Sequence, residues 1–405
     1  MPLQVEVYSW TNKGGQTEER MNRRTFLKII GGGIILSATA GMTGCTSEMP
    51  AGAIAAWQGP GAEPDVRRWI LSYAILAPHS HNLQSWLVDL KYPGEIILYC
   101  DTKRLLPETD PYFRQIMMSH GTFLELLDIA ARQRGYRTDI RLFPEGAFAT
   151  GKIDSRPVAR IRLLEDVGVA KDPLFSRILK RHTSREPYNI TRKVPAAALQ
   201  AMTESVQMYP VRFGFVGQDQ PELLAKHRTI AAAAWHVELT TPDKILETFH
   251  WLRVGGSEIA RHRDGISLND PIVTMLTRLG LFDRTKAPKP DDSATVDQIK
   301  SFGRLLAATP AFLWLVTDDN ERSTQIGAGR AYLRAQLAGS AHGLSMQPLQ
   351  QALQEYPEQQ ENYVEIHKLL DAPRPQHTVQ MWARVGFGPA VGPAPRRGLQ
   401  EHVIT

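Results

Sequence analysis

Cysteine is scarce in this sequence, and this limits the chemistry that the chain can support. Only Cys45 and Cys100 occur among 405 residues, without a Cys-x-x-Cys pair or a cysteine and histidine cluster at metal-ligand spacing. We therefore expect no metal site, and a disulfide between the two cysteines is not indicated. Cys100 ends the strand-like run 95–100, where we expect a small buried side chain.

A strong excess of one charge is also missing. The formal net charge is +5, and it falls to +3 when residues 1–44 are set aside, because they hold five basic and three acidic side chains. A nucleic-acid-binding protein needs a concentrated basic face, so we expect no nucleic-acid partner. The hydrophobic share of 42% nevertheless allows a sizeable core and does not resemble disorder.

The N-terminus carries the pattern of an export signal. Residues 22–28 read Asn-Arg-Arg-Thr-Phe-Leu-Lys, close to the twin-arginine pattern Arg-Arg-x-Phe-Leu-Lys. The uncharged stretch 29–42 that follows has about fourteen residues, fewer than the about 20 of a membrane-spanning helix. A buried core helix is the alternative, but adjacent arginines and three consecutive glycines suit it poorly. Because the twin-arginine route exports folded proteins, the signal favours a cofactor that is inserted before export.

A lipoprotein processing site is expected at the end of this signal. Met42-Thr43-Gly44-Cys45 has its pattern, with cleavage nearby and no lipid as the alternative, and Met21 is a plausible true start besides Met1. We expect residues 1–45 to be the signal and residues 46–62, rich in Ala, Gly and Pro, to be a flexible linker. The mature protein is then expected in the periplasm or on the outer face of a bacterial membrane, touching the membrane only through the signal or a lipid.

Helices and strands intermix after residue 63 without a regular βαβ order, which predicts an α+β fold. Apolar periodicity and end signals predict helices at 65–76, 111–134, 173–180, from Pro195 onward, at 223–251 in two pieces broken near Pro242, and at 327–342. Strands are predicted at 85–90, 95–100, 138–143, 158–164, 211–216, 312–317 and 378–385.

Three short segments carry polar groups that could bind a ligand. Residues 77–86 read Ala-Pro-His-Ser-His-Asn-Leu-Gln-Ser-Trp, and amide side chains suit the edge of a flat heteroaromatic ring. Residues 181–185 read Arg-His-Thr-Ser-Arg, whose guanidinium and hydroxyl groups could converge on a phosphate, as could Arg396 and Arg397. Taken singly, the first segment can equally be read as a well-capped loop, the second as a solvated helix end and the third as a surface tail.

Together and in order, the segments resemble the nitroreductase family of FMN proteins. The resemblance is greatest to the branch typified by the mycobacterial Acg proteins, in which two nitroreductase folds lie in one chain. Residues 77–86 are similar to the family pattern Ala-Pro-Ser-x-His-Asn-x-Gln-Pro-Trp, and residues 181–185 to Arg-x-Ser-x-Arg. Further matching segments are 104–107, 110–111, 119–121, 263–265, 343–349, 384–387 and 395–397.

The resemblance implies a nitroreductase-like fold of two pseudo-symmetric halves, 63–168 and 169–405, each with a mainly antiparallel sheet flanked by helices. One chain would thus mimic the two-fold dimer of ordinary family members, and it would hold one FMN as a pseudo-dimeric monomer. The implied cofactor-binding residues of the phosphate end are Arg181, Thr183, Ser184 and Arg185, with Arg396 or Arg397. Those of the ring end are Ser80, His81, Asn82 and Gln84, with Gln347, Pro348 and Leu349 at the other ring edge.

Three functions follow as hypotheses. The first is an exported FMN-dependent oxidoreductase that passes electrons from a donor other than NAD(P)H to a quinone- or nitroaromatic-like acceptor. The second is an FMN-sequestering protein with a covered flavin, for which residues 264–290 are the expected lid. The third is an exported binding lipoprotein without flavin. The flavin itself would supply the chemistry, so no catalytic residue is assigned, and for His81 a structural hydrogen-bonding role is favoured.

Overall fold

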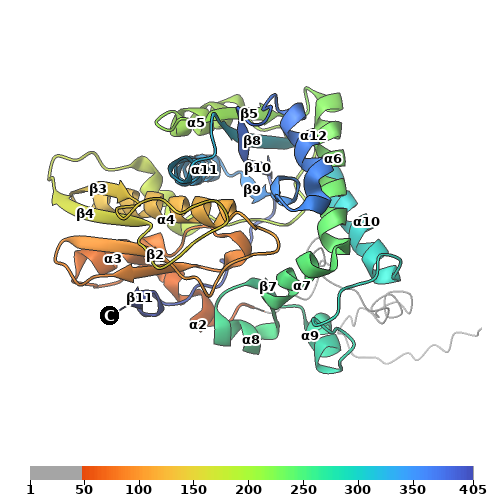
Figure 1. Cartoon of the computed structure of the whole chain (residues 1–405), viewed down its shortest axis with the longest axis horizontal. Coiled ribbons are helices and arrows are strands. Elements are labelled where there is room, and N and C mark those ends of the chain that lie inside the picture. Colours follow the sequence, from red (N-terminus) through yellow and green to blue (C-terminus); the bar gives the residue numbers. More distant parts are fainter. Residues whose placement is uncertain (1–47, 405) are drawn as a thin grey trace, which may run out of the picture.

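The first of two sheets lies in the N-terminal part of the chain. The structure, a computed structural model, describes residues 48–404. Five strands pair in the order β11-β1-β2-β4-β3, and all neighbours are antiparallel except β11, which runs parallel to β1. The C-terminal strand thus completes the N-terminal sheet (Figure 1). The strands are β1 (Trp86–Asp89), β2 (Glu95–Cys100), β3 (Tyr136–Leu142), β4 (Ala159–Glu165) and β11 (Val403–Ile404).

The second sheet is built from the C-terminal part. Its four strands pair antiparallel in the order β5-β8-β10-β9. Residues of β8 and β10 are buried almost throughout; β8 is a nearly continuous apolar run, whereas β10 also buries Gln380 and Arg384. The strands are β5 (Arg212–Val216), β8 (Ala311–Thr317), β9 (Ser345–Pro348) and β10 (Thr378–Gly386).

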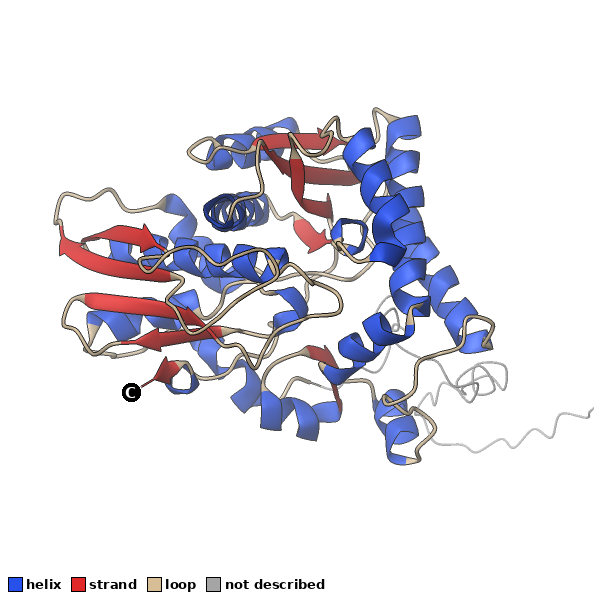
Figure 2. Ribbon diagram, in the orientation of Figure 1, coloured by secondary structure: helices blue, strands red, loops and turns tan. Residues whose placement is uncertain are grey.

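Two long helices, α4 (Arg114–Gln133) and α11 (Arg322–Ala341), lie against each other between the sheets (Figures 1 and 2). Their backbones touch at two glycines. A Cβ on Gly121 would lie 2.0 Å from the Ile326 carbonyl oxygen, and one on Gly329 would lie 1.9 Å from that of Met118. Each helix therefore contributes one glycine to a reciprocal crossing, which sets the distance between the two sheets.

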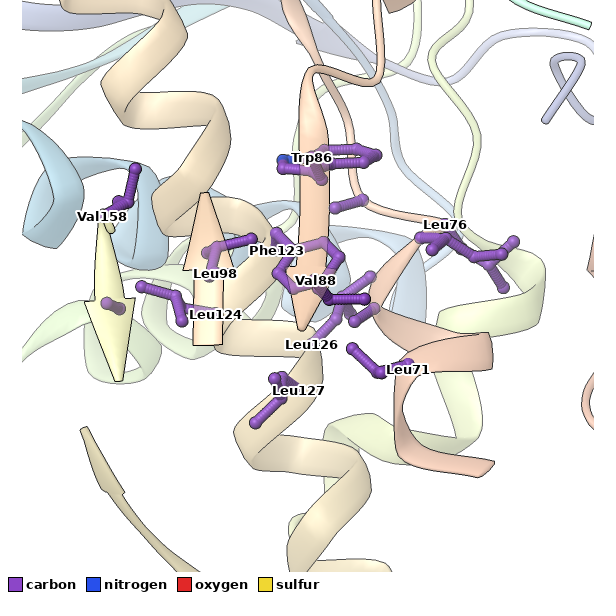
Figure 3. Close-up of a cluster of buried hydrophobic side chains, with 14 of the residues drawn as sticks. Leu71, Leu76, Trp86, Val88, Leu98, Phe123, Leu124, Leu126, Leu127 and Val158 are labelled. Atoms are coloured by element: carbon purple, nitrogen blue, oxygen red, sulfur yellow. The ribbon is translucent and has the colours of Figure 1, made fainter. Parts of the chain in front are cut away.

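The first sheet buries its apolar face against α4 and the shorter helix α3 (Val66–Ala74) (Figure 3). Trp86, Leu98, Phe123 and Leu127 are fully buried in this cluster, and the Trp86 indole donates to the Ser119 carbonyl at 3.3 Å. Complete burial of such side chains stabilises the fold by about 1.5–3 kcal/mol each. The loop that precedes Trp86 is thereby attached to a rigid base.

The remaining helices surround the second sheet and extend one side of the molecule (Figure 1). A small parallel pair, β6 (Leu252–Val254) with β7 (Ile266–Leu268), lies among them. The helices are α5 (Ala196–Val206), α6 (Pro221–Thr240), α7 (Pro242–His250), α8 (Gly255–His262), α9 (Pro271–Arg278), α10 (Ser293–Ala307) and α12 (Gln360–Leu369). Single-turn and 3₁₀ pieces are α2 (Ala51–Ile54), η2 (Ala55–Gln58), η3 (Ser80–Asn82), η4 (Pro173–Lys180), η5 (Gln351–Leu353), η6 (Pro357–Gln359) and η7 (Leu399–Glu401).

The predicted α+β class is confirmed, and the break predicted near Pro242 separates α6 from α7. The helix predicted at 327–342 starts earlier, at Arg322, because Arg322 donates to the backbone carbonyls of Tyr112 and Ala149 in the other half. The sequence analysis missed β6, β7, β9, β11 and helices α8, α9, α10 and α12.

The expected flexible linker, residues 46–62, is folded where the structure describes it. The segment 51–58 forms α2 and η2, and Trp57 is buried, with its indole donating to the Ala394 carbonyl at 2.8 Å. The expectation of a flexible linker rests on composition, and composition does not show that Trp57 packs into the core beside the C-terminal segment. The expected signal, residues 1–45, with Met21 and Cys45, lies outside the described residues. Within residues 48–404, no helix is both long enough and apolar enough to cross a membrane.

Candidate functional site

A cavity of about 410 Å³ is lined by residues from both the N-terminal and the C-terminal part of the described chain. This volume is in the range of small-molecule and cofactor sites, about 300–1,000 Å³. Its walls come from both parts of the chain: from α4 and the loop at 78–82 on one side, and from β9, α6, α7 and α10 on the other. Ten of the thirteen predicted cofactor-binding residues line it, namely Ser80, His81, Asn82, Arg181, Thr183, Arg185, Gln347, Pro348, Leu349 and Arg396.

The loop before β1 is held in an unusual backbone conformation. His81, Asn82 and Gln84 all have positive φ values, 47°, 54° and 56°. Non-glycine residues in this region are strained, and such strain persists only where the surroundings hold it in place. Asn82 is the residue held most firmly: its amide donates to the carbonyls of Gly265 and Pro395, both at 3.1 Å.

Gly265 can approach Asn82 only because it lacks a side chain. Its backbone N–H donates to the Asn82 carbonyl at 3.1 Å, and a Cβ there would lie 2.2 Å from the Trp251 carbonyl oxygen. Gly265 also has a φ of +70°, which glycine adopts at little cost. The loop at 79–84 is therefore fixed by a segment more than 180 residues away in the chain.

Two buried arginines meet at one end of the cavity. Arg181 and Arg396, each 3% exposed, both donate to the Leu76 carbonyl, at 3.0 and 3.3 Å. Both guanidinium groups also lie over the Trp57 ring, 5.6 and 5.4 Å from its centroid. Neither forms an ion pair with a carboxylate of the described residues. We call this the cationic end, defined by Arg181, Arg396 and Trp57.

The unpartnered polar atoms at this end are mostly donors. Arg181 Nε, Arg396 Nε and Gln336 Nε2 are buried without a hydrogen-bond partner among the described residues, as is the Tyr332 hydroxyl. Burial lowers the pKa of Arg181 to about 10 and that of Arg396 to about 9, and in Arg396 the charge of Arg181 adds to the effect. Both remain cations at neutral pH. Buried cations with spare donors and no carboxylate suit an anionic ligand.

A third arginine, Arg185, also lines the cavity. Its side chain has no hydrogen bond or ion pair with a described residue and keeps access to solvent within the cavity. The surrounding protein still desolvates it, which lowers its pKa, and its charge lowers the pKa of His81. Among the described residues, Arg185 is therefore a cation without a side-chain partner, near enough to His81 to affect its pKa.

A further arginine, Arg384 on β10, organises the wall opposite the loop. Its Nε donates to Gln347 Oε1 at 2.6 Å, and its Nη2 donates to the Glu186 carbonyl at 2.8 Å. Thr183 forms an isolated bridge with Met346, which brings the segment 181–185 alongside β9. The sequence analysis quoted Arg384 in a matching segment without assigning it to the site.

Three predicted site residues lie outside the cavity lining. The Gln84 side-chain oxygen accepts from the Arg397 backbone N–H at 2.9 Å, and Arg397 Nη2 donates to the Gln84 carbonyl at 2.7 Å. Ser184 is buried and uses its backbone to contact Met346 and Arg384. Gln84 and Arg397 thus join the C-terminal segment to the loop, and we leave these three residues out of the proposed ligand contacts.

The other end of the cavity holds a buried carboxyl that the sequence analysis missed. Glu238 on α6 is 2% exposed; one carboxyl oxygen accepts from Thr248 Oγ1 at 3.3 Å and the other from Gln354 Nε2 at 2.9 Å. Thr248 Oγ1 lies 3.0 Å from His81 Nε2. Burial raises the pKa of Glu238 to about 7 and lowers that of His81 to about 4. Nothing in the sequence around Glu238 marks it, because its partners come from three other segments.

Within residues 48–404, no group of three or more His, Cys, Asp or Glu side chains is arranged to hold a metal ion. Cys100 is buried, as expected from the sequence, and burial raises the pKa of its thiol.

Comparison with known proteins gives relatives but no matching family model. Two curated proteins from strains of Mycobacterium tuberculosis, provisionally named NAD(P)H nitroreductases, are each 26% identical over 362 residues. The alignment covers 85% of this chain and 95% of each relative. These relatives support the resemblance to the nitroreductase family.

Solved structures give likenesses of low TM-score. An FMN-dependent nitroreductase of Mycobacterium smegmatis in complex with NADPH is 16% identical, covering 56% of this chain and 94% of that one, with a TM-score of 0.35. A provisionally identified nitroreductase of Desulfovibrio desulfuricans in complex with FMN is 14% identical, covering 57% and 95%, with a TM-score of 0.32.

Proposed function

We propose that this chain is an FMN-dependent oxidoreductase of the nitroreductase type that binds one FMN in the cavity between its halves. The observation that carries the proposal is the cationic end: Arg181 and Arg396 are buried without a carboxylate partner among the described residues, and each has an unused Nε donor. A terminal phosphate would supply the missing acceptors. The names of the two mycobacterial relatives agree with the nitroreductase type, although they give NAD(P)H as the donor.

The lining residues fit the rest of the cofactor. The cavity is also lined by Arg185, by Ser80 and His81 of the loop, and by Gln347 and Leu349. We assign these polar groups to the edges of a flat ring, and Arg185, which the resemblance assigns to the phosphate end, to the pyrimidine part of that ring. When bound, FMN would supply two-electron redox chemistry. A cation beside the N1–C2=O edge favours the reduced, negatively charged ring, and this would be the role of Arg185.

The electron donor is proposed to be other than NAD(P)H. The proposal rests on the expected twin-arginine signal at residues 1–45, since an exported protein does not meet the cytoplasmic pyridine nucleotides. A quinone-like or nitroaromatic acceptor is proposed because the inner part of the cavity has aromatic walls, Trp235 and Phe302, which suit a flat ring. Lipid attachment at Cys45, the Acg-like branch and the pseudo-dimeric monomer belong to the same proposal.

One observation favours the second candidate, an FMN-sequestering protein. Ile266, Ser267 and Leu268, in the expected lid 264–290, line the cavity, so this segment would lie against a bound flavin. The segment is tied down at its start, since Asp264 accepts from Arg253 Nε at 2.8 Å and pairs with Arg104. A cover attached in this way would limit the access of large acceptors to the ring.

The first experiment is the absorption spectrum of the purified protein, with the released flavin identified and counted. We expect a yellow protein with one FMN for each chain. The flavin is then reduced with dithionite, and its reoxidation by menadione, a naphthoquinone, is compared with that by a nitroaromatic compound; NADPH is tested separately as a donor. Fast reoxidation supports the oxidoreductase, and slow reoxidation by every acceptor supports sequestration. A folded, colourless protein that takes up no added FMN would refute both.

A further inference from the structure

The buried Glu238 carboxyl has no role in the proposed binding of FMN, yet it lies at the cavity wall. Glu238, Thr248 and His81 form a continuous row: Thr248 Oγ1 is 3.3 Å from the carboxyl and 3.0 Å from His81 Nε2. His81 Nδ1 in turn lies 3.4 Å from Ser80 Oγ. All four residues line the cavity. We refer to these four side chains as the Glu238 row.

From this row we infer a proton-delivery path: Glu238 stores a proton that passes through Thr248 and His81 to the acceptor in the cavity. The inference rests on the proposed function. Reduction of a quinone-like acceptor to the hydroquinone adds two electrons and two protons, of which FMN, when bound and reduced, would supply both electrons and one proton. The second proton must come from a group of the protein or from water. The Glu238 row supplies this second proton.

The geometry allows the transfer with all atoms accounted for. The O–H bond of Glu238 breaks as its proton moves to Thr248 Oγ1, and the hydroxyl proton of Thr248 moves to His81 Nε2. The proton on His81 Nδ1 leaves, across the Ser80 hydroxyl, to the acceptor oxygen. Glu238 is left as a carboxylate, Thr248 and Ser80 are unchanged, and His81 has exchanged one neutral tautomer for the other. Water entering the cavity then returns a proton to Glu238.

The surroundings of the row suit it to this task. Burial and, to a smaller extent, the negative charge of Glu247 on α7 raise the pKa of Glu238, whereas the hydrogen bonds from Gln354, Thr248 and Gln351 lower it. The resulting pKa is about 7. Tyr356 is the other titratable group that this carboxyl affects, and its pKa is raised. His81 stays neutral because burial and Arg185 lower its pKa to about 4. A neutral imidazole can accept at one nitrogen while it donates at the other.

The test is the reoxidation of the dithionite-reduced, FMN-loaded protein by menadione, followed in a stopped-flow instrument from about pH 5 to about pH 9. In the wild type we expect the limiting rate to fall as the pH rises through about 7. Glu238→Gln should lower the limiting rate by at least about tenfold at the acidic end and remove this pH dependence, with little change in the half-saturating menadione concentration. Glu247→Gln removes one negative charge from the surroundings of Glu238, so it should shift the pH profile to lower pH without abolishing it.

Two further variants test whether Thr248 transfers a proton or only supports the structure. Thr248→Val interrupts the row and should slow reoxidation as Glu238→Gln does, whereas Thr248→Ser restores the hydroxyl and should restore the rate. Infrared spectra give a readout apart from activity: a protonated carboxyl band should titrate near pH 7 in the wild type and in Thr248→Val, and be absent in Glu238→Gln.

Failure of this inference can be told from failure of the proposed function. If the protein binds and reduces FMN but Glu238→Gln or Thr248→Val keeps the wild-type rate and pH profile, the proton path is refuted and the function stands. If Glu238→Gln does not fold, equal rates in Thr248→Val and Thr248→Ser refute the path. A protein without FMN would refute the proposed function itself.

Discussion

Replacing Arg185 with alanine tests the proposed cofactor site without disturbing the fold. Arg181 and Arg396 donate to backbone carbonyls, so their loss would alter the protein as well as the ligand contacts. The Arg185 side chain makes no hydrogen bond or ion pair with any residue in the described range 48–404, although it lines the cavity. Arg185→Ala should therefore leave the unfolding free energy of the FMN-free protein unchanged, because no hydrogen bond or ion pair with a described residue is lost.

The expected loss of FMN affinity follows from the contact that Arg185 would make. A hydrogen bond to a charged group contributes about 1.5–3 kcal/mol. Since about 1.4 kcal/mol corresponds to a tenfold change in dissociation constant, Arg185→Ala should weaken FMN binding about 10- to 150-fold. Arg181→Ala together with Arg185→Ala should leave folded protein largely free of flavin, because two cations are then missing from the site.

The assay is a fluorescence titration of flavin-free protein with FMN, accompanied by thermal unfolding without ligand. Arg261→Ala is the matched control for Arg185→Ala, and Arg261→Ala with Arg278→Ala is the control for the double variant, since these remove exposed cations outside the cavity lining and give the same changes in net charge. We expect both controls to bind FMN as the wild type does. Unchanged FMN affinity in Arg185→Ala, or equal weakening in its control, would show that the cavity is not the FMN site that we propose.

Three other predictions follow from the structure. Trp57→Ala removes a ring that lies over both Arg181 and Arg396, and at about 1 kcal/mol for each of the two cation–π contacts it should lower the unfolding free energy by about 2 kcal/mol or more, measured by chemical unfolding. Gly329→Ala should destabilise the protein by about 3 kcal/mol in chemical unfolding, because its Cβ would meet the Met118 carbonyl, whereas Gly327→Ala on the same helix has open space and should be neutral or stabilising. Glu238→Gln should alter the pH dependence of stability. In the wild type, the raised pKa of Glu238 lowers the unfolding free energy by about 3 kcal/mol between pH 4.5, the ordinary pKa of a glutamate, and about pH 7, whereas the variant lacks this loss. Parallel stability curves for the two proteins between these pH values would contradict the assignment.

The elements that the sequence predicted well are those whose signals are local. The helix 65–76, the strands at 85–90 and 95–100 and the break near Pro242 depend on the order of apolar residues and on proline within one segment. The missed strands β9 and β11 have only four and two residues. Such short strands exist because β10 and β1 offer them an edge to pair with, and that edge comes from a distant part of the chain.

The sequence also identified most of the cavity lining, because the loop 78–82 and the segment 181–185 each bring several polar groups together within a few residues. It could not assign the direction of single side chains. Gln84 and Arg397 carry the expected amide and guanidinium groups, yet they bond to each other outside the cavity lining. The Gln84 side-chain oxygen accepts from the Arg397 backbone N–H, and the Arg397 guanidinium donates to the Gln84 carbonyl. The difference depends on where the C-terminal segment crosses the loop, and no local pattern encodes that crossing.

The sequence by itself determined the fold class, the cationic and amide groups of the site and the order in which they occur, since these follow from composition and short-range pattern. Only the tertiary structure decided that Arg396 joins Arg181 at the Leu76 carbonyl, that Trp57 covers both, and that Glu238 reaches His81 through Thr248. The physical reason is burial. Whether a cation lacks a counter-ion, or a carboxyl keeps its proton near neutral pH, depends on which groups from distant segments exclude water around it.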